Sequence, residues 1–134
     1  MIVVDTNVIG YLFLSSEHSD QAERALRKDA DWAAPLLWRS EFRNVLATYL
    51  HQDLVALEDA LHIIREAESL LEGGEYAVGS AQVLRLAKSS GCSAYDCEFV
   101  ALAQDLNVPL VTVDQRILSQ FPGISIALDE FVAK

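Results

Sequence analysis

Short apolar runs of three to five residues alternate along the chain with longer segments in which apolar residues recur every three or four positions. The short runs are typical of buried strands, and the longer periodic segments are typical of helices packed on one side. The predicted strands cover residues 2–4, 32–34, 76–78, 109–113 and 124–127. The predicted helices cover residues 8–14, 20–28, 36–51, 55–71, 80–89, 93–106, 115–119 and 128–132. Because helices separate successive strands, the pattern predicts an α/β fold with a parallel sheet covered on both faces.

Two of the predicted helices have informative apolar faces. In residues 36–51, Leu37, Glu41 and Val45 follow one another at intervals of four, so Glu41 is expected on a face that is otherwise apolar or weakly polar. A carboxylate in such a place is unusual unless it has a partner or a function. In residues 55–71 we predict an apolar stripe made of Leu57, Leu61, Ile64 and Leu71.

Four carboxylates stand at corresponding ends of predicted elements. Asp5 and Asp114 each end a predicted strand, Asp96 lies in the first turn of a helix, and Glu41 lies near the start of another. In an open parallel sheet the carboxyl ends of the strands and the N-termini of the following helices share one edge, where ligands bind near the reversal of strand order. We therefore expect these four carboxylates, from distant segments, to meet in one cleft.

A cluster of carboxylates needs protons or a cation. Two like charges about 4 Å apart repel by about 4 kcal/mol at an effective dielectric constant of about 20. Oxygen ligands favour Mg²⁺ or Mn²⁺, and such an ion can orient a phosphate and activate water for phosphodiester hydrolysis. Zinc is disfavoured because the histidines lie in different segments, where surface or core positions are expected for His18, His51 and His62.

Hydroxyl and basic groups flank the acids in the sequence. Thr6 and Thr112 place hydroxyls beside Asp5 and Asp114, where they could hold a carboxylate or a metal-bound water, or simply serve as a helix cap and a strand hydroxyl. The nearby arginines could bind a phosphate or pair with acids on a solvated face. These arginines are Arg39, Arg43 and Arg116.

A simpler interpretation exists for each acid taken alone. The segment Asp5-Thr6-Asn7 could cap the helix that follows it, with Thr6 and Asn7 as candidate caps, and Asp114 could cap the next turn. Asp96 has the spacing of a capping box with the serine three residues before it. The functional interpretation gains its weight from the four acids together, and from the unusual position of Glu41 above all.

The composition describes a compact acidic chain. A length of 134 residues with 51% hydrophobic residues predicts one globular domain over residues 1–134. The net charge of −10 is poorly suited to nucleic acid and favours a basic protein partner. Cys92 and Cys97 are too few for a zinc site or a disulfide framework and are expected in structural, buried positions. Without a basic leader or an apolar run of about 20 residues, we expect a cytoplasmic protein that does not enter a membrane.

The chain resembles PIN domains along its whole length, and among them the VapC-type toxins of toxin–antitoxin pairs. The resemblance rests on four motifs in a characteristic order: IVVDTN near the start, SEFRN in the third predicted helix, SAYDCEFVALA, and PLVTVD. Each motif is modest alone, but their order and spacing are specific. No acidic residue of the family pattern is missing.

The resemblance implies a fold, an activity and partners. It implies a three-layer α/β/α fold with about five parallel strands, and an endoribonuclease that depends on Mg²⁺ or Mn²⁺. It implies that Asp5, Glu41, Asp96 and Asp114 are the catalytic and metal-binding acids. We add four supporting residues next to them, namely Thr6, Asn7, Thr112 and Arg116. It further implies a homodimer and a cognate VapB-like antitoxin, which in this family often places a basic side chain in the acid cluster.

Other functions are possible for such a chain. A PIN-fold nuclease with a housekeeping role, acting on RNA or DNA, would use the same acids, and a non-catalytic PIN-fold subunit would keep them for binding. A haloacid-dehalogenase-type phosphatase needs an aspartate two residues after the first, where Asn7 stands. A response-regulator receiver needs an acidic pair after its first strand, where only Asp5 is present.

Overall fold

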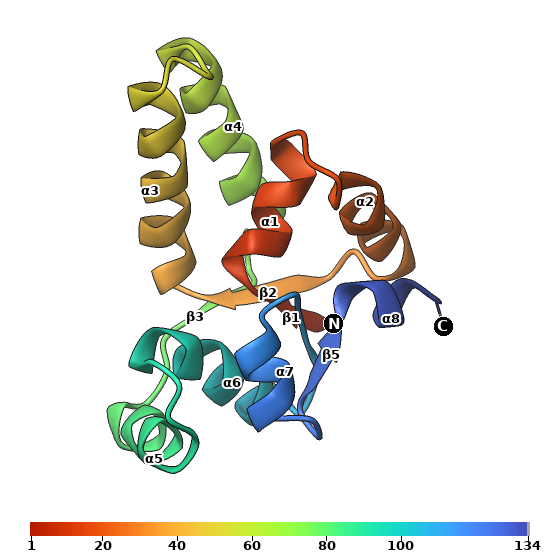
Figure 1. Cartoon of the computed structure of the whole chain (residues 1–134), viewed down its shortest axis with the longest axis vertical. Helices are drawn as coiled ribbons and strands as arrows, with labels where there is room; N and C mark the ends of the chain where they lie inside the picture. Colours follow the sequence, from red (N-terminus) through yellow and green to blue (C-terminus); the bar gives the residue numbers. More distant parts are fainter. Residues whose placement is uncertain (134) are drawn as a thin grey trace.

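A parallel five-stranded sheet forms the centre of the molecule, and the computed structural model describes residues 1–133 (Figure 1). The strands are β1 (Ile2–Val4), β2 (Trp32–Pro35), β3 (Glu75–Tyr76), β4 (Leu110–Thr112) and β5 (Ser125–Ala127). They lie in the order β3-β2-β1-β4-β5, and every neighbouring pair is parallel. The predicted α/β class and the parallel sheet are therefore confirmed.

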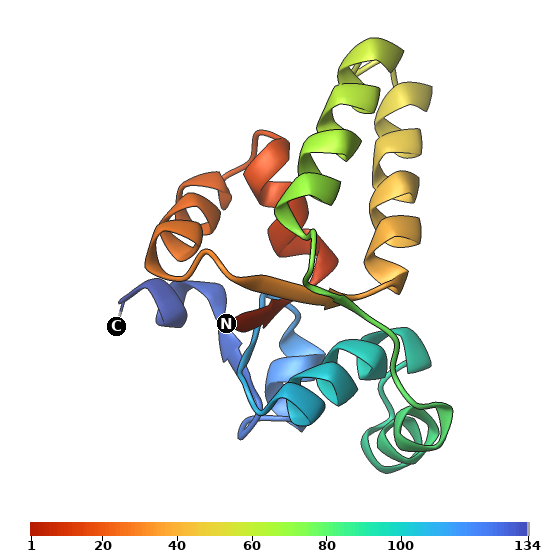
Figure 2. The ribbon, with the colours of Figure 1, turned by 180° about the vertical axis from the view of Figure 1, so that it is seen from behind.

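Helices cover both faces of this sheet. They are α1 (Thr6–Phe13), α2 (Ser19–Lys28), α3 (Leu37–His51), α4 (Leu57–Leu70), α5 (Ser80–Ser90), α6 (Ala94–Leu106), α7 (Gln115–Gln120) and α8 (Leu128–Ala133). Figures 1 and 2 show α1 to α4 on one side of the sheet and α5 to α7 on the other, with α3 and α4 standing away from it as a pair. The arrangement is the three-layer α/β/α architecture. No helix within residues 1–133 is long and apolar enough to cross a membrane.

The core lies between β1 and the helices on either side of it. All three residues of β1 are buried, and α6, which contacts β1, β2 and β4, buries an almost continuous apolar run. Cys92 and Cys97 are free thiols within this core, as predicted. Because both faces of the central strands are sealed, polar groups can reach solvent only at the ends of the strands.

The strand order reverses at β1. From β1 the chain adds β2 and then β3 on one side, and it later crosses to add β4 and β5 on the other. The carboxyl ends of β1 and β4 are thus the place where a ligand is expected in an open α/β sheet. Asp5 follows the first of these strands, and Asp114 lies just after the second.

The ends of these two strands differ only in part from the prediction. β1 ends at Val4, within the predicted range 2–4, but β4 ends at Thr112, one residue before the predicted end. Neither aspartate is a strand residue, and each is instead the N-cap of the next helix. Asp5, not Thr6 or Asn7, caps α1. An aspartate oxygen satisfies the free N–H groups of a first helical turn, which ends the strand early.

The apolar faces of α3 and α4 were predicted only in part. In α3 the fully buried face is Trp38, Phe42 and Leu46, while Leu37 and Val45 on the face of Glu41 are half-buried and pack against the core. In α4 the predicted stripe is partly in solvent, since Leu57 is 60% exposed and Leu61 46% exposed. The core contacts of α4 come from small residues and from Leu71 just after it; the small residues are Ala60 and Ala67. The leucines thus lie on an uncovered face of the α3–α4 pair.

The turn before β3 depends on a residue without a side chain. Gly74 is buried, its N–H donates to the carbonyl oxygen of Leu71, and its own carbonyl accepts from the N–H of Ala34 in β2. A Cβ at Gly74 would overlap the carbonyl oxygen of Trp32 and lie 3.3 Å from its carbonyl carbon. Backbone atoms of a central strand cannot move aside without disturbing the sheet.

Replacing Gly74 with Ala is therefore expected to lower the free energy of unfolding by about 2 kcal/mol. Urea denaturation followed by circular dichroism measures the change. Gly123→Ala is the matched control, because a Cβ there meets nothing within 4 Å and its φ is not left-handed. Equal stability of the two variants would contradict the steric argument.

Candidate active site

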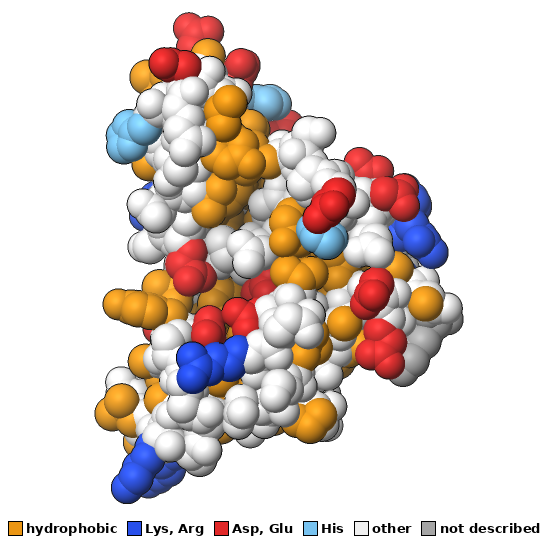
Figure 3. Space-filling model, viewed as in Figure 1, with side chains coloured by type: hydrophobic (Ala, Val, Ile, Leu, Met, Phe, Trp, Pro, Cys, Tyr) orange, Lys and Arg blue, Asp and Glu red, His pale blue; other side chains and the backbone are white. Residues whose placement is uncertain are grey.

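The four predicted acids line a single cleft of about 270 Å³. The cleft lies beyond the ends of β1 and β4, and Figure 3 shows acidic side chains gathered in the hollow between the two helical layers, with a basic side chain at its rim. Its lining residues are Asp5, Thr6, Asn7, Glu41, Asn44, Val45, Asp96, Phe99, Asp114 and Ile117. The prediction that these acids meet at one edge of the sheet agrees with the geometry.

Asp5 is the most enclosed of the four acids, with 7% of its surface exposed. One carboxylate oxygen accepts a hydrogen bond from the N–H of Val8 at 3.0 Å, and the other accepts from the hydroxyl of Thr112. Burial raises the pKa of Asp5 from its ordinary 3.8 to about 6, although the bonds from Thr112 and Val8 oppose the rise. The negative charge of Asp114 adds a little to it.

Asp114 is held by the start of α7. One of its oxygens accepts from the N–H groups of Arg116 and Ile117, at 2.9 and 3.0 Å. Its own N–H donates to the hydroxyl oxygen of Thr112 at 3.0 Å. Thr112 is fully buried and thus connects Asp5 to Asp114 through one hydroxyl group.

Asp96 enters the cleft from the first turn of α6. Ser93 caps this helix by accepting a hydrogen bond from the N–H of Asp96 at 3.0 Å. Burial, followed by the charge of Asp114, raises the pKa of Asp96. A side-chain hydrogen bond with Ser93 and the positive charge of Arg116 oppose this rise. Arg116 does not line the cleft, but it lies close enough to act on its acids.

Glu41 completes the cluster from α3 on the opposite helical layer. Its carboxylate accepts a hydrogen bond from the hydroxyl of Thr6 at 2.7 Å, so the second predicted hydroxyl also holds an acid. A further acid that was not predicted lies nearby: Glu98 has its pKa raised by burial and by the charge of Glu41. The cleft therefore collects negative charge from both helical layers.

The sequence of this chain matches a known protein family over most of its length. Residues 2–123 match the PIN domain. The chain belongs to the PIN-domain family. This PIN domain is 29% identical over 126 residues to Ribonuclease VapC3 from Pyrobaculum aerophilum, covering 92% of this chain and 96% of that relative.

Solved structures share the PIN fold at low sequence identity. PAE2754 from Pyrobaculum aerophilum has a TM-score of 0.73 and 19% identity, covering 98% of this chain and 93% of that one. A toxin–antitoxin complex from Klebsiella pneumoniae has a TM-score of 0.70 and 16% identity, covering 96% and 98%. FitAcB from Neisseria gonorrhoeae has a TM-score of 0.68 and 22% identity, covering 95% and 96%. These similarities establish the fold of the chain.

The donor groups of the PIN-domain cleft suit a hard divalent cation. Four carboxylates line it, and two of them, Asp5 and Asp96, have raised pKa values because burial and neighbouring negative charge disfavour their ionised forms. Within residues 1–133, however, no three His, Cys, Asp or Glu side chains stand close enough together to hold one ion directly. Mg²⁺ usually keeps several waters and needs only one or two carboxylates, so the arrangement fits a hydrated ion better than a dehydrated one.

Two residues differ from what the sequence predicts for the site. Asn44 lines the cleft one helical turn after Glu41, and its place in the SEFRN motif was the available signal. Arg39, a candidate for phosphate binding, instead pairs with Glu75 at 2.6 Å and Glu68 at 2.7 Å. It joins α3 to the start of β3 and to α4, so its role is structural.

Proposed function

We propose that this PIN-domain protein is a divalent-metal-dependent endoribonuclease that acts as the toxin of a VapBC-type toxin–antitoxin pair. The observation that carries the proposal is the meeting of Asp5, Glu41, Asp96 and Asp114 in one cleft where β1 and β4 end. The relative named Ribonuclease VapC3, which aligns over nearly the whole chain, supports the same reaction.

The four acids, in part through bound waters, would hold Mg²⁺ or Mn²⁺, which when bound orients a phosphodiester and makes a water molecule a better nucleophile at neutral pH. Other residues of the protein position the acids and the substrate. Thr112 fixes the Asp5 carboxylate and Thr6 fixes Glu41. Arg116 places positive charge beside Asp96, where the phosphate of an RNA strand would approach. Asn7 lines the cleft and offers an amide to the substrate or to bound water.

An antitoxin partner follows from the same proposal. The solved neighbours include a toxin–antitoxin complex from Klebsiella pneumoniae and FitAB bound to a DNA fragment. On this chain, Leu54, Leu57 and Leu61 expose apolar surface on the α3–α4 pair, and the net charge of −10 favours a basic partner. We propose a VapB-like antitoxin for this surface, a homodimer as the assembled toxin, and the cytoplasm as its compartment.

Cleavage of a mixed RNA pool tests the proposed reaction. The full-length chain is expected to cut single-stranded RNA when Mg²⁺ or Mn²⁺ is supplied and to stop when EDTA removes the ion. Asp96→Asn is expected to lower the rate by about a hundredfold or more, because one charged ligand is lost. Asp105→Asn, an exposed change on the same helix, should leave the rate unaltered. Equal rates for native and Asp96→Asn proteins, or equal cleavage of single-stranded DNA, would contradict the assignment.

A further inference from the structure

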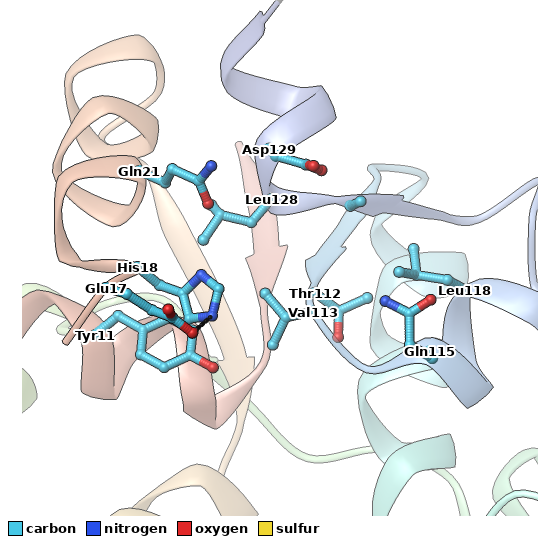
Figure 4. Close-up of a pocket in the computed structure, with 11 residues that line it drawn as sticks. Tyr11, Glu17, His18, Gln21, Thr112, Val113, Gln115, Leu118, Leu128 and Asp129 are labelled. Atoms are coloured by element: carbon cyan, nitrogen blue, oxygen red, sulfur yellow. Dashed lines mark ion pairs between the residues drawn. The ribbon is translucent and has the colours of Figure 1, made fainter.

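A second, larger cavity of about 610 Å³ lies beside the acid cleft and has no part in the proposed cation site. It is bounded by α1 and the start of α2 on one side and by α7 and the start of α8 on the other, with β4 and β5 between them (Figure 4). We call it the side pocket. Its aromatic wall is Tyr11 and His18, and its opposite wall contains Gln115 and Leu118.

The two rings of the side pocket form a paired surface. The centroids of Tyr11 and His18 are 4.7 Å apart and their planes are inclined by 36°. Figure 4 shows both rings on the same side of the pocket, with Val113 between them and Gln115. A flat heteroaromatic group entering the pocket would therefore meet aromatic faces, an apolar floor and amide groups able to bond its edge.

The charges of the side pocket favour an uncharged ligand. No Lys or Arg is among the lining residues in the described part of the chain, whereas Glu17 and Asp129 stand at its edges. A phosphate would be repelled there. Glu17 lies against the His18 ring, with its Oε1 3.4 Å from Nε2 (Figure 4). Carboxylates can accept hydrogen bonds from the amino and imino groups of a nucleobase, and unpaired bases of RNA are typically held by stacking on Tyr or His with hydrogen bonds to their edges.

The side pocket also adjoins the acids. Thr112, which donates to Asp5, lines it. Tyr11 lines both the side pocket and a smaller cavity of about 160 Å³ whose other walls include Thr6 and Asn7, which also line the acid cleft. An RNA chain with one phosphate in the acid cleft can therefore place a neighbouring base in the side pocket.

We propose that the side pocket binds an unpaired nucleobase of the RNA strand whose phosphate lies in the acid cleft, with His18 and Tyr11 as the stacking surface. The proposal rests on the proposed ribonuclease function and adds to it a site that selects flexible, unpaired RNA. Stacking would also add to the few contacts that an acidic chain can make with phosphate, because aromatic faces hold bases without charge.

His18→Ala is the variant that tests this proposal. His18 is the N-cap residue of α2, but its side chain makes no capping bond, and its backbone bonds to Ser16 and Ala22 do not need the ring. The fold should therefore tolerate the change. His18→Phe keeps an aromatic face and should restore binding. Tyr95→Ala removes an aromatic ring that is 63% exposed and lies outside the pocket, and it serves as the control.

Binding is measured by fluorescence anisotropy with a labelled single-stranded hexaribonucleotide at low salt, with Ca²⁺ in place of Mg²⁺ so that an ion with oxygen ligands fills the cleft, and gel electrophoresis checks that the strand stays intact. Six further oligonucleotides each lack one base. His18→Ala is expected to weaken binding of the intact strand about tenfold. One abasic strand should bind the native protein equally weakly, and His18→Ala should weaken that strand no further, because the stacked pair is already absent.

The outcomes separate this proposal from the proposed reaction. If His18→Ala weakens every abasic strand as much as the intact one, or weakens none of them, the side pocket is not a base site. An equal effect of Tyr95→Ala on binding, or a failure of His18→Phe to restore affinity, would lead to the same conclusion. Failure of the native chain to cleave RNA with Mg²⁺ would overturn the reaction alone, since the binding measurement does not depend on cleavage.

Discussion

Replacing Asp5 with Asn is expected to slow metal-dependent RNA cleavage by about a thousandfold or more, equivalent to about 4 kcal/mol of transition-state stabilisation. Asp5 is the most buried acid of the cleft, and it follows the central strand of the sheet directly. An asparagine can keep the hydrogen bond from Val8, so the geometry of α1 is retained while the negative charge is lost. The charge is the property that holds a divalent cation.

Initial rates on a defined single-stranded RNA at saturating Mg²⁺ measure the effect. Asp31→Asn makes the same chemical change on an exposed loop residue and should leave the rate within about twofold of native. If Asp5→Asn keeps more than about a tenth of the native rate, then Asp5 is not part of the cation site. Circular dichroism of both variants checks that their folds are intact.

The edge of the sheet could be predicted because two simple patterns determine it. Apolar runs such as Ile2–Val4 have no polar face and must be buried on both sides, which requires a parallel sheet between helices. Residues that follow such runs, Asp5 and Asp114, must then lie at the carboxyl edge. The prediction needed only the direction of the strands, which the connecting helices set. It did not need the order of the strands.

The contacts of long side chains could not be predicted in the same way. Arg39 lies two residues before Glu41 in the sequence, yet it pairs with Glu68 and Glu75, which are 29 and 36 residues away. Such partners depend on how α3 and α4 pack. The exposed leucines of α4 show the same limit, because periodicity identifies an apolar face but not whether the same chain covers it.

The cleft illustrates a third limit of sequence motifs, because one acid can be a helix cap and also line the cleft. Asp5 and Asp114 are helix caps, and Ser93 caps the helix that carries Asp96. Capping fixes each carboxylate at the start of a helix, and the sheet brings these helix starts together. A motif read alone reveals the cap, whereas only the assembly of four segments reveals the cleft.

The same Asp5→Asn change is expected to stabilise the metal-free protein by about 3 kcal/mol near neutral pH, because a shift of the pKa by one is worth about 1.4 kcal/mol. The pKa of Asp5 is near 3.8 in an unfolded chain and about 6 in the folded protein, chiefly because of burial. Between these values the folded protein binds more protons than the unfolded chain, so its stability falls as the pH rises. Asn carries no such charge.

The difference in unfolding free energy between Asp5→Asn and native protein should therefore be small near pH 4 and reach its full value above about pH 7. Urea denaturation in EDTA across this range measures it. Asp29 and Glu75 have lowered pKa values and lose their stabilising effect in acid, but they are present in both proteins and cancel in the difference. A difference that does not vary with pH would show that Asp5 is not strained by its burial.

Adding Mg²⁺ should then reduce the difference in unfolding free energy between Asp5→Asn and native protein, because it stabilises the native protein more. An ion that binds only the folded native protein stabilises it by about 1.4 kcal/mol when its concentration is about ten times its dissociation constant, while Asp5→Asn should respond much less. The acid that most destabilises the empty cleft would thus be the one that gains most from the cation. Such a trade between stability and activity is expected where a buried charge is kept for function, and it predicts that the most active arrangement of this cleft is not its most stable one.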